Sequence, residues 1–257
     1  MTGPFPRRVA LIRHGEYHQQ PDTPSAHQPH PLTREGEVHA EAGAQEVLAL
    51  CHLHGWQIED CLHSSTLLRA WQTGSFMAAT LERALGQPFK LITHDVLCER
   101  SLGSAANLTA RQIEHVISQD PRMSALPNDW KSNSHYRLPL PGAESLLQAG
   151  ERVAAYLHAL PLPASSASLT LVIGHGAAFR HAAHLLGVLA FEEIARLSMH
   201  HGRPVILEEV LLEDVCEAED DNALQAASAP EDVRTTTQWR HVAGEWKQRK
   251  LHESARD

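Results

Sequence analysis

The chain has 257 residues, of which 42% are apolar, so it is long enough for a sizeable hydrophobic core and ordinary in composition for a globular protein. Its 31 acidic residues outnumber its 22 lysines and arginines, and the net charge is −9 with histidine neutral. This balance argues against a nucleic-acid binder, which usually presents a basic face, but it is compatible with a local positive pocket for a small anion.

The first hundred residues alternate between strand and helix signals. The apolar run over residues 9–12 predicts a buried strand that stops at Arg13 and His14. Thr33 is placed to cap the following amphipathic helix, which Gly55 would end. The elements expected here, in chain order, are a strand over 8–13, a helix over 33–53, a strand over 58–65, a helix over 67–85 and a strand over 89–96.

The alternation is interrupted over residues 97–142. A short helix is expected over 109–118, and the remainder is rich in proline and asparagine and long for a loop in a compact domain. We interpret residues 104–142 as a lid insertion. Five of its side chains mix cations with aromatic rings and would either contact a ligand or lie in a solvated loop: Trp130, Lys131, His135, Tyr136 and Arg137.

The alternation resumes after residue 142. Residues 214–232 are acidic and poor in large apolar side chains, which predicts a mobile loop, and the last residues are expected to fray. The regular elements expected in this half are a helix over 143–160, a strand over 169–175, a helix over 177–186, an edge strand over 204–213 with charges at its middle, and a partner strand over 235–246.

Strands that alternate with helices are typical of a mainly parallel sheet covered by helices on both faces. We therefore predict an α/β fold, a three-layer αβα sandwich with a mainly parallel sheet, a lid insertion and an antiparallel edge strand. Residues 1–257 are expected to form one domain. Ligands of such sheets bind beyond the carboxyl ends of the strands, so functional residues are expected just after the strand ends.

Charged side chains follow several of these strand ends. Two guanidinium groups and two imidazoles there can hold a dianionic phosphate, because the planar guanidinium binds two phosphate oxygens at once. A neutral imidazole can attack phosphorus while a protonated one helps to hold the anion. A carboxylic acid beside them can protonate the leaving oxygen. The residues concerned are Arg13, His14, Arg69, Glu99 and His175.

Two glycines accompany the histidines of this set. The backbone N–H groups of Gly15 and Gly176 can face a phosphate, because glycine carries no side chain to obstruct it. Glu16, Asp95 and Glu144 remain alternatives to Glu99 as the acid, since exposed carboxylates are common.

Cysteine and histidine usage points to a protein without a metal site. The four cysteines form no CxxC pair, and the 19 histidines include no HEXXH motif. The apolar run over 9–12 is too short for a signal peptide or a membrane span. We expect a cytoplasmic protein that needs no cofactor or metal and binds neither nucleic acid nor membrane, and the sequence leaves its oligomeric state open.

Six segments, in order between residues 8 and 182, resemble the signature of the histidine phosphatase superfamily, whose fold is that of phosphoglycerate mutase. A lone RHG is weak evidence, whereas six ordered segments at plausible spacing are strong evidence. The segments are LIRHGE (11–16), PLTREGEVHA (31–40), HSSTLLRAWQT (63–73), CERSLGS (98–104), PGAES (141–145) and LVIGHGAAFR (171–180).

The resemblance implies a role for each matching residue. His14 would be the nucleophile that becomes phosphorylated, Arg13 and Arg69 would grip the phosphate, and His175 would complete the pocket. Glu99 would act as the general acid and later as the base for water. These roles describe metal-independent hydrolysis of a phosphomonoester.

The chain also departs from the family pattern. Gln20 stands where the family often has an asparagine that contacts phosphate. The tyrosine-containing stretch after the acid and the paired arginines of the mutase branch are missing, which favours hydrolysis over phosphoryl transfer. A mutase-type phosphotransferase and a catalytically idle phosphate-binding module remain the alternatives. The substrate is expected to be a phosphorylated small molecule or a phosphoprotein.

Overall fold

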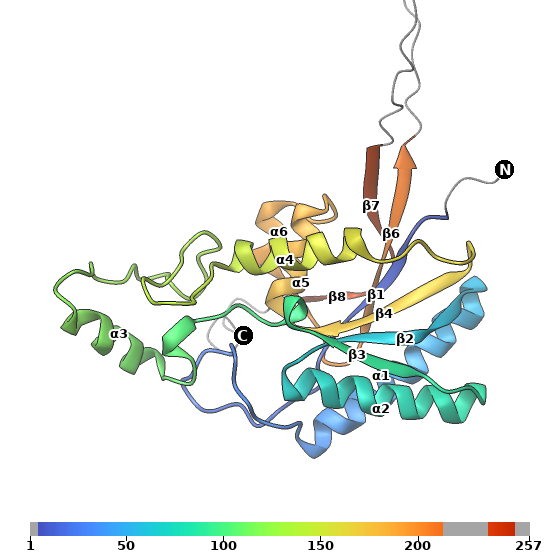
Figure 1. The fold of residues 1–257 in the computed structure, drawn as a ribbon, viewed down its shortest axis with the longest axis horizontal. Coiled ribbons are helices and arrows are strands. Elements are labelled where there is room, and N and C mark those ends of the chain that lie inside the picture. The colour runs from blue at the N-terminus through green and yellow to red at the C-terminus, as the bar shows by residue number, and fades with distance from the viewer. Residues whose placement is uncertain (1–4, 213–235, 250–257) are drawn as a thin grey trace, which may run out of the picture.

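The computed structural model describes residues 5–212 and 236–249 and contains a six-stranded sheet (Figure 1). Its strand order is β3-β2-β4-β1-β6-β7. Strands β1 to β4 are parallel to one another, β6 is antiparallel to β1, and β7 is antiparallel to β6. The strands are β1 (Arg8–Arg13), β2 (Gln57–Ser65), β3 (Lys90–His94), β4 (Ser168–Gly174), β6 (Pro204–Leu212) and β7 (Thr236–Gly244), and a separate antiparallel pair is formed by β5 (Leu197–Met199) and β8 (Trp246–Gln248).

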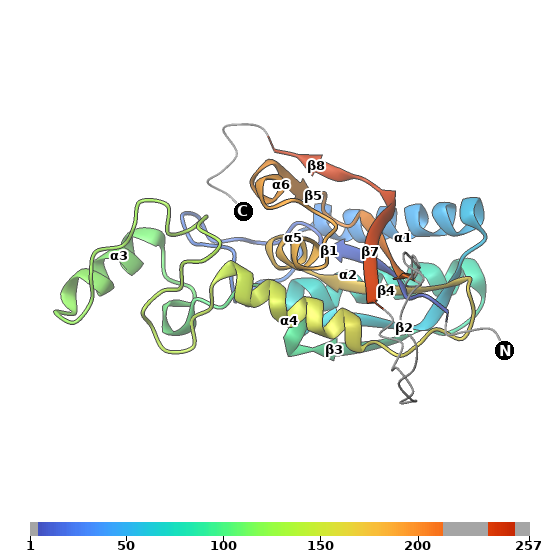
Figure 2. The same ribbon diagram turned by 90° about the horizontal axis from the view of Figure 1, so that it is seen from above.

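Helices cover both faces of the sheet, which confirms the predicted αβα sandwich (Figure 1). One face packs against α1 (Arg34–His54) and α2 (Leu68–Leu85), and the other packs against α4 (Leu146–Ala159) and α5 (Gly176–Leu185). The shorter helices α3 (Ala110–Gln119) and α6 (Phe191–Arg196) lie outside these layers (Figure 2).

Strand β1 shows why the first apolar run is continuous rather than alternating. Val9 and Leu11 belong to the core under α4 and α5, whereas Ala10 and Ile12 belong to the core under α1 and α2. A central parallel strand is buried on both faces, so both sets of side chains are apolar.

Helix boundaries follow local capping signals. Thr33 caps α1 by accepting a hydrogen bond from the N–H of Gly36, and Gly55 ends the helix in the left-handed conformation. Helix α4 begins at Leu146, three residues later than expected, because Ser145 and Gln148 form a capping box at its start.

The strand over 204–212 was expected at the edge, and this prediction is wrong. It lies between β1 and β7, so β7 is the antiparallel edge strand. The charges at its middle are buried and paired: Glu208 binds Arg8 and Arg240, and Glu209 binds Arg7. Charged residues mark an edge strand only when water solvates them, and these are instead neutralised by arginines.

The predicted lid, residues 104–142, extends beyond the carboxyl ends of the parallel strands (Figures 1 and 2). It has a small core of its own, in which Ile113, Ile117 and Leu138 pack around Trp130. Trp130 is therefore a buried core residue rather than a ligand contact on a solvated loop.

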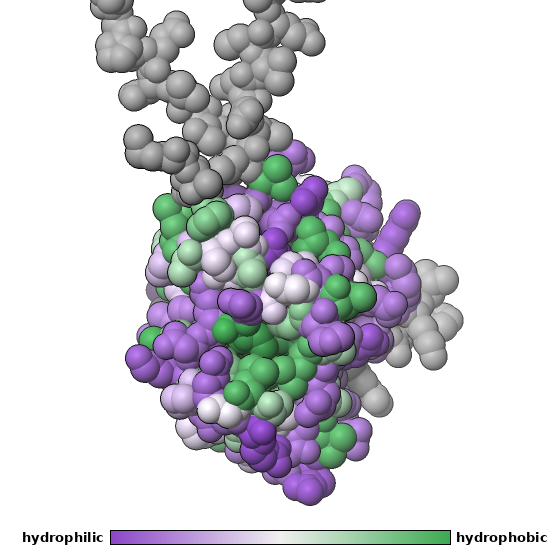
Figure 3. Space-filling view, turned by 90° about the vertical axis from the view of Figure 1, so that its right-hand side faces the viewer, coloured by the Kyte–Doolittle hydropathy of each residue, from purple (hydrophilic) through white to green (hydrophobic). Residues whose placement is uncertain are grey.

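The opposite end of the molecule, at the amino ends of the parallel strands, shows a hydrophobic patch among hydrophilic residues (Figure 3). No helix in the described part of the chain is long and apolar enough to cross a membrane. The predicted mobile loop over 214–232 and the end of the tail lie outside the described residues.

Candidate active site

Three predicted site residues meet at the carboxyl edge of the sheet. His14 follows β1, Arg69 lies in the first turn of α2, and His175 follows β4 and caps α5. All three are buried, with exposed fractions of 2% for His14 and 0% for Arg69 and His175. The ring centroids of the two histidines are 5.1 Å apart. Parallel neighbours β1 and β4 end at the same edge, so their terminal histidines converge.

Arg69 joins the two histidines. Its Nε donates to His14 Nε2 at 3.1 Å, and one terminal nitrogen lies 3.2 Å from His175 Nδ1. The same guanidinium donates to the backbone carbonyls of Ala26 and Gln28, which fix its plane. A planar donor held in this way can bind phosphate oxygens between the two rings.

The hydrogen bonds of His14 define which of its nitrogens carries the lone pair. Its Nδ1 lies 2.7 Å from the carbonyl oxygen of Gly15, so Nδ1 carries the proton and donates it. Its Nε2 accepts from Arg69 and therefore holds the lone pair. A neutral imidazole with the lone pair on Nε2 is the form required of a nucleophile.

The hydrogen bonds of His175 fix the opposite tautomer from that of His14. Because its Nδ1 faces an arginine, the proton lies on Nε2, which donates to Ser65 Oγ at 2.9 Å. The Ser65 hydroxyl in turn donates to Cys98 Sγ. Ser65 ends β2, at the edge of the sheet where functional residues are expected.

Burial, reinforced by the positive charge of Arg69, holds the pKa of both His14 and His175 well below the usual value for histidine. Without a bound anion, the positive charge of the site therefore comes from Arg13 and Arg69. That one histidine becomes protonated to hold a phosphate dianion stays a prediction, because a nearby negative charge favours the charged imidazole.

The buried histidines predict that stability falls in mild acid. Below about pH 6.5 the unfolded chain protonates these side chains, whereas the folded chain keeps them neutral until their lowered pKa is reached. Each such histidine can contribute a slope of at most about 1.4 kcal/mol per pH unit. Urea unfolding measured across this range should show a shallower slope for the His14→Gln, His175→Gln double variant. An unchanged slope would contradict the assignment of both groups as neutral in the folded state.

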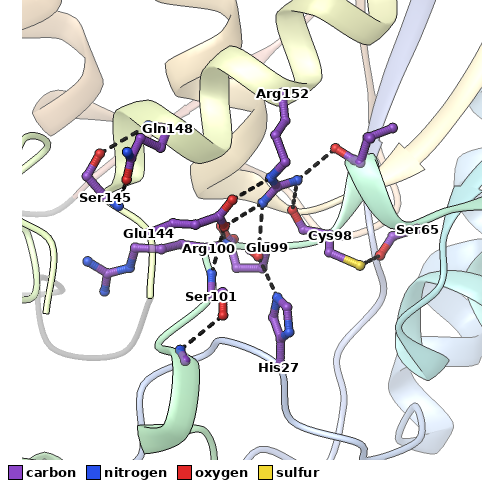
Figure 4. Close-up of polar contacts among 12 residues, drawn as sticks. His27, Ser65, Cys98, Glu99, Arg100, Ser101, Glu144, Ser145, Gln148 and Arg152 are labelled. Atoms are coloured by element: carbon purple, nitrogen blue, oxygen red, sulfur yellow. Dashed lines mark hydrogen bonds and ion pairs between the residues drawn. The ribbon is translucent and has the colours of Figure 1, made fainter. Parts of the chain in front are cut away.

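Glu99 lies beside this cluster, in a turn held by polar contacts (Figure 4). Its carboxylate accepts the backbone N–H of Arg100 at 2.9 Å and that of Ala177, in the first turn of α5, at 3.3 Å. The second contact places the carboxyl group next to the helix that His175 caps.

Arg152 holds the backbone of the Glu99 turn (Figure 4). Its guanidinium donates to the carbonyl oxygens of Val96, Cys98 and Glu99 and pairs with Glu144 at 2.7 Å. The N–H of Ser101 also binds Glu144. Glu144 therefore supports the turn, which distinguishes it from Glu99.

The other two alternative acids lie elsewhere. Asp95 accepts a hydrogen bond from Thr66, and Glu16 is exposed and accepts one from Thr33. Of the four carboxylates considered, Glu99 is the one whose side chain contacts the start of α5.

Two predicted phosphate contacts are not supported by the arrangement. The N–H of Gly15 already donates to Thr73 Oγ1 at 2.9 Å, and a Cβ atom at Gly15 would lie 2.2 Å from the carbonyl oxygen of Gly36. Gly15 is thus needed for the close approach of α1, and its contact with a phosphate stays a prediction. Gln20 is exposed, and among the described contacts its backbone N–H binds Gln28 while none joins its side chain to His14.

Arg13 and Gly176 lie where the sequence predicted them. Gly176 is the first residue of α5, and the side chain of Arg13 passes alongside it, with Arg13 Cδ 3.2 Å from the position of a Cβ atom there. Arg13 also donates to the carbonyl oxygen of Met199 at 3.1 Å. This contact places the guanidinium between the start of α5 and strand β5.

Sequence reasoning missed two residues that enclose the histidine. The Tyr17 ring stacks on the guanidinium of Arg69 at 4.5 Å and meets His14 edge-on at 5.2 Å. His201 Nδ1 donates to the carbonyl oxygen of His14 at 2.7 Å. His201 comes from the loop before β6, far along the chain, and only its presence in the MHHG stretch could have drawn attention to it.

Within the described residues, no group of three or more His, Cys, Asp or Glu side chains is arranged to hold a metal ion. The charge available for an anion is supplied by arginines, and the proton donor and acceptor groups by His14, His175 and Glu99. The arrangement can therefore bind a phosphate dianion, present an imidazole lone pair to phosphorus and place a carboxyl group nearby.

Residues 9–211 match the sequence profile of the histidine phosphatase superfamily, branch 1. A 2,3-bisphosphoglycerate-dependent phosphoglycerate mutase of Parvibaculum lavamentivorans is 25% identical over 207 residues, which cover 79% of this chain and 91% of that protein. A protein of the same name from Brucella ovis is 28% identical over 203 residues, 78% of this chain and 91% of that protein. A mycobacterial glucosyl-3-phosphoglycerate phosphatase shares the fold, with a TM-score of 0.57 at 19% identity over 79% of this chain and 90% of that one.

Proposed function

This chain belongs to the histidine phosphatase superfamily, branch 1, and on that premise we propose that it hydrolyses phosphomonoesters through a phosphohistidine at His14. The observation that carries this proposal is the neutral, buried imidazole of His14, whose Nε2 lone pair points at the guanidinium of Arg69. A histidine that merely ended a strand would need neither this tautomer nor an arginine on its Nε2.

In the first step, the substrate phosphate binds Arg69 and Arg13, and His14 Nε2 attacks phosphorus. A phosphorus–nitrogen bond forms as the bond from phosphorus to the ester oxygen breaks. Glu99, in its protonated form, gives its proton to the departing oxygen. The two guanidiniums stabilise the charge on the transferring group, so the step needs no metal.

In the second step, Glu99 takes a proton from water while the water oxygen attacks phosphorus. The phosphorus–nitrogen bond breaks, which returns His14 to its neutral form and releases orthophosphate. His175 Nδ1 also faces Arg69, and Ser65 binds its Nε2. A proton taken up on Nδ1 as the dianion binds would let His175 donate to a phosphate oxygen.

The names of the mutase relatives support a second candidate, transfer of the phosphoryl group from His14 to another hydroxyl. The two candidates share the first step and differ in the acceptor of the second. The missing tyrosine-containing stretch and arginine pair favour water as the acceptor.

Product analysis tests the proposal. The protein is incubated with a panel of phosphomonoesters in the presence of EDTA, and the products are followed by phosphorus NMR. We expect free orthophosphate to appear and the organic phosphate to disappear at the same rate. Phosphate that reappears on another carbon or acceptor would assign the transferase activity, and binding without any turnover would assign an idle phosphate-binding module.

A further inference from the structure

Two histidines and a tyrosine meet at the edge of the sheet, and the proposed reaction uses none of them. His63 lies in β2, His94 ends β3, and Tyr156 belongs to the last turn of α4. His63 Nδ1 lies 3.3 Å from His94 Nε2 and 2.7 Å from the hydroxyl oxygen of Tyr156. All three side chains are half-buried, so water reaches each of them.

The two imidazole nitrogens have the separation of two ligands on one tetrahedral Zn²⁺ ion. Zinc binds a histidine nitrogen at about 2.0–2.1 Å, and two such bonds at the tetrahedral angle place their nitrogens about 3.3 Å apart. The ring centroids are 5.4 Å apart, farther than the nitrogens, so the two rings converge on those nitrogens. The parallel pairing of β2 with β3, in which Ser65 lies opposite His94, holds both rings in place.

The protons of the cluster leave room for a cation. Among the contacts of the described residues, none joins His63 Nε2 or His94 Nδ1 to another group, so both ring protons can lie on these nitrogens. His63 Nδ1 and His94 Nε2 then present lone pairs to one another, and the hydroxyl proton of Tyr156 is donated to the first of them. A single proton cannot satisfy both lone pairs, whereas one metal ion can.

The surroundings of these histidines differ from those of the active-site pair. The pKa of His63 is lowered by burial and by His94, and that of His94 is lowered by burial. At His14 and His175, by contrast, the positive charge of Arg69 adds to burial. Arginine beside an imidazole favours an anion, and a neutral imidazole pair without such a neighbour favours a metal ion.

The cluster connects α4 to the strand that leads to the acid turn. Tyr156 follows Arg152 by one helical turn, and Arg152 donates to the carbonyl oxygen of Val96, two residues after His94. An ion bound by both His94 and Tyr156 would therefore tie α4 to the end of β3, beside the existing Arg152 contact. The segment held in this way continues into the Glu99 turn.

We propose that His63 Nδ1, His94 Nε2 and Tyr156 Oη bind a Zn²⁺ ion, with water completing the coordination. Three bonds to zinc form, and the hydroxyl proton passes to solvent, so one proton leaves for each ion bound. Burial raises the pKa of the free Tyr156 hydroxyl, and a bound cation acts in the opposite direction. The two imidazoles and the phenol differ from the groups of three His, Cys, Asp or Glu side chains that the described residues lack. The site is independent of the reaction proposed at His14.

Zinc titration of the full chain tests the site after metal has been stripped with EDTA and the EDTA removed. We expect Tm to rise with added Zn²⁺, because the ion binds the folded state. Affinity is measured by competition with a chromophoric chelator. His63→Gln and His94→Gln should each weaken binding by about tenfold or more, and the exposed control His52→Gln should bind as wild type does.

Tyr156→Phe tests the third ligand, because it removes the hydroxyl and keeps the ring. Calorimetric titration in buffers of different ionisation enthalpy should show one proton released per ion in wild type and none in this variant. Circular dichroism in EDTA checks that each variant is folded, and the His94 and Tyr156 variants report independently of His63. Zinc that leaves Tm unchanged, or that binds His63→Gln and His94→Gln as tightly as wild type, overturns the site. Equal proton release in wild type and Tyr156→Phe overturns the assignment of Tyr156 as a ligand.

Discussion

Replacing His14 with alanine is expected to lower kcat/KM for phosphomonoester hydrolysis by about 10⁴-fold or more, because the variant has no atom to accept the phosphoryl group. Arg69 and His175 would still bind phosphate in the variant, so binding should survive the loss of turnover. The measurement is orthophosphate release in EDTA by wild type and variant. Rapid quenching of the wild-type reaction should also trap a phosphoryl group that is stable in base and labile in acid, on the peptide that contains His14.

The matched control is His52→Ala, which removes an exposed histidine of α1 from the same protein. It should release orthophosphate at the wild-type rate and trap the same amount of phosphoryl group on the His14 peptide. Full activity in His14→Ala, or a trapped phosphoryl group on another peptide, would contradict the nucleophilic role of His14.

Glu99→Gln is expected to lower kcat for an alkyl phosphate by about 10²- to 10⁴-fold, the usual contribution of a positioned general acid. Glutamine keeps the size of the side chain but cannot supply a proton to the departing oxygen. For p-nitrophenyl phosphate, whose leaving group needs no proton, the first step should be much less affected. A burst of nitrophenol before slow release of orthophosphate is therefore expected, because Glu99 is also proposed to activate the water of the second step.

Glu16→Gln is the control for this experiment, since Glu16 is an exposed carboxylate close to His14 in sequence. It should leave kcat unchanged for both the alkyl phosphate and p-nitrophenyl phosphate. Equal losses for the two substrates in Glu99→Gln would assign Glu99 a structural role. The leaving-group dependence would then be measured in Glu144→Gln, a change that also removes the charged partner of Arg152.

Much of the fold was predictable because its signals are local. The apolar run of β1, the Thr33 cap of α1 and the glycines that end α1 and α2 each act within a few residues of the chain. The strand-end rule also predicts His14 and His175 at one edge of the sheet, because parallel strands end together.

The errors arose where a residue's meaning depends on a distant partner. The charges at the middle of residues 204–213 were interpreted as the mark of an edge strand, but Arg8 and Arg240 from neighbouring strands neutralise Glu208. Gly15 was interpreted as space for a phosphate, and the structure adds a second reason for glycine there, the close backbone of α1. In both cases the residue type alone left the role of the residue open, and its packing partners in the folded structure decided that role.

The sequence by itself determined the alternating architecture, the family and the set of groups proposed for phosphoryl transfer, because periodicity, caps and ordered motifs are properties of the chain. Only the tertiary structure decided the tautomers of His14 and His175, the support of the Glu99 turn by Arg152, and the meeting of His63 with His94. Those features depend on side chains that lie far apart in the sequence. Their charges and hydrogen bonds act on one another only after the sheet brings the strand ends together.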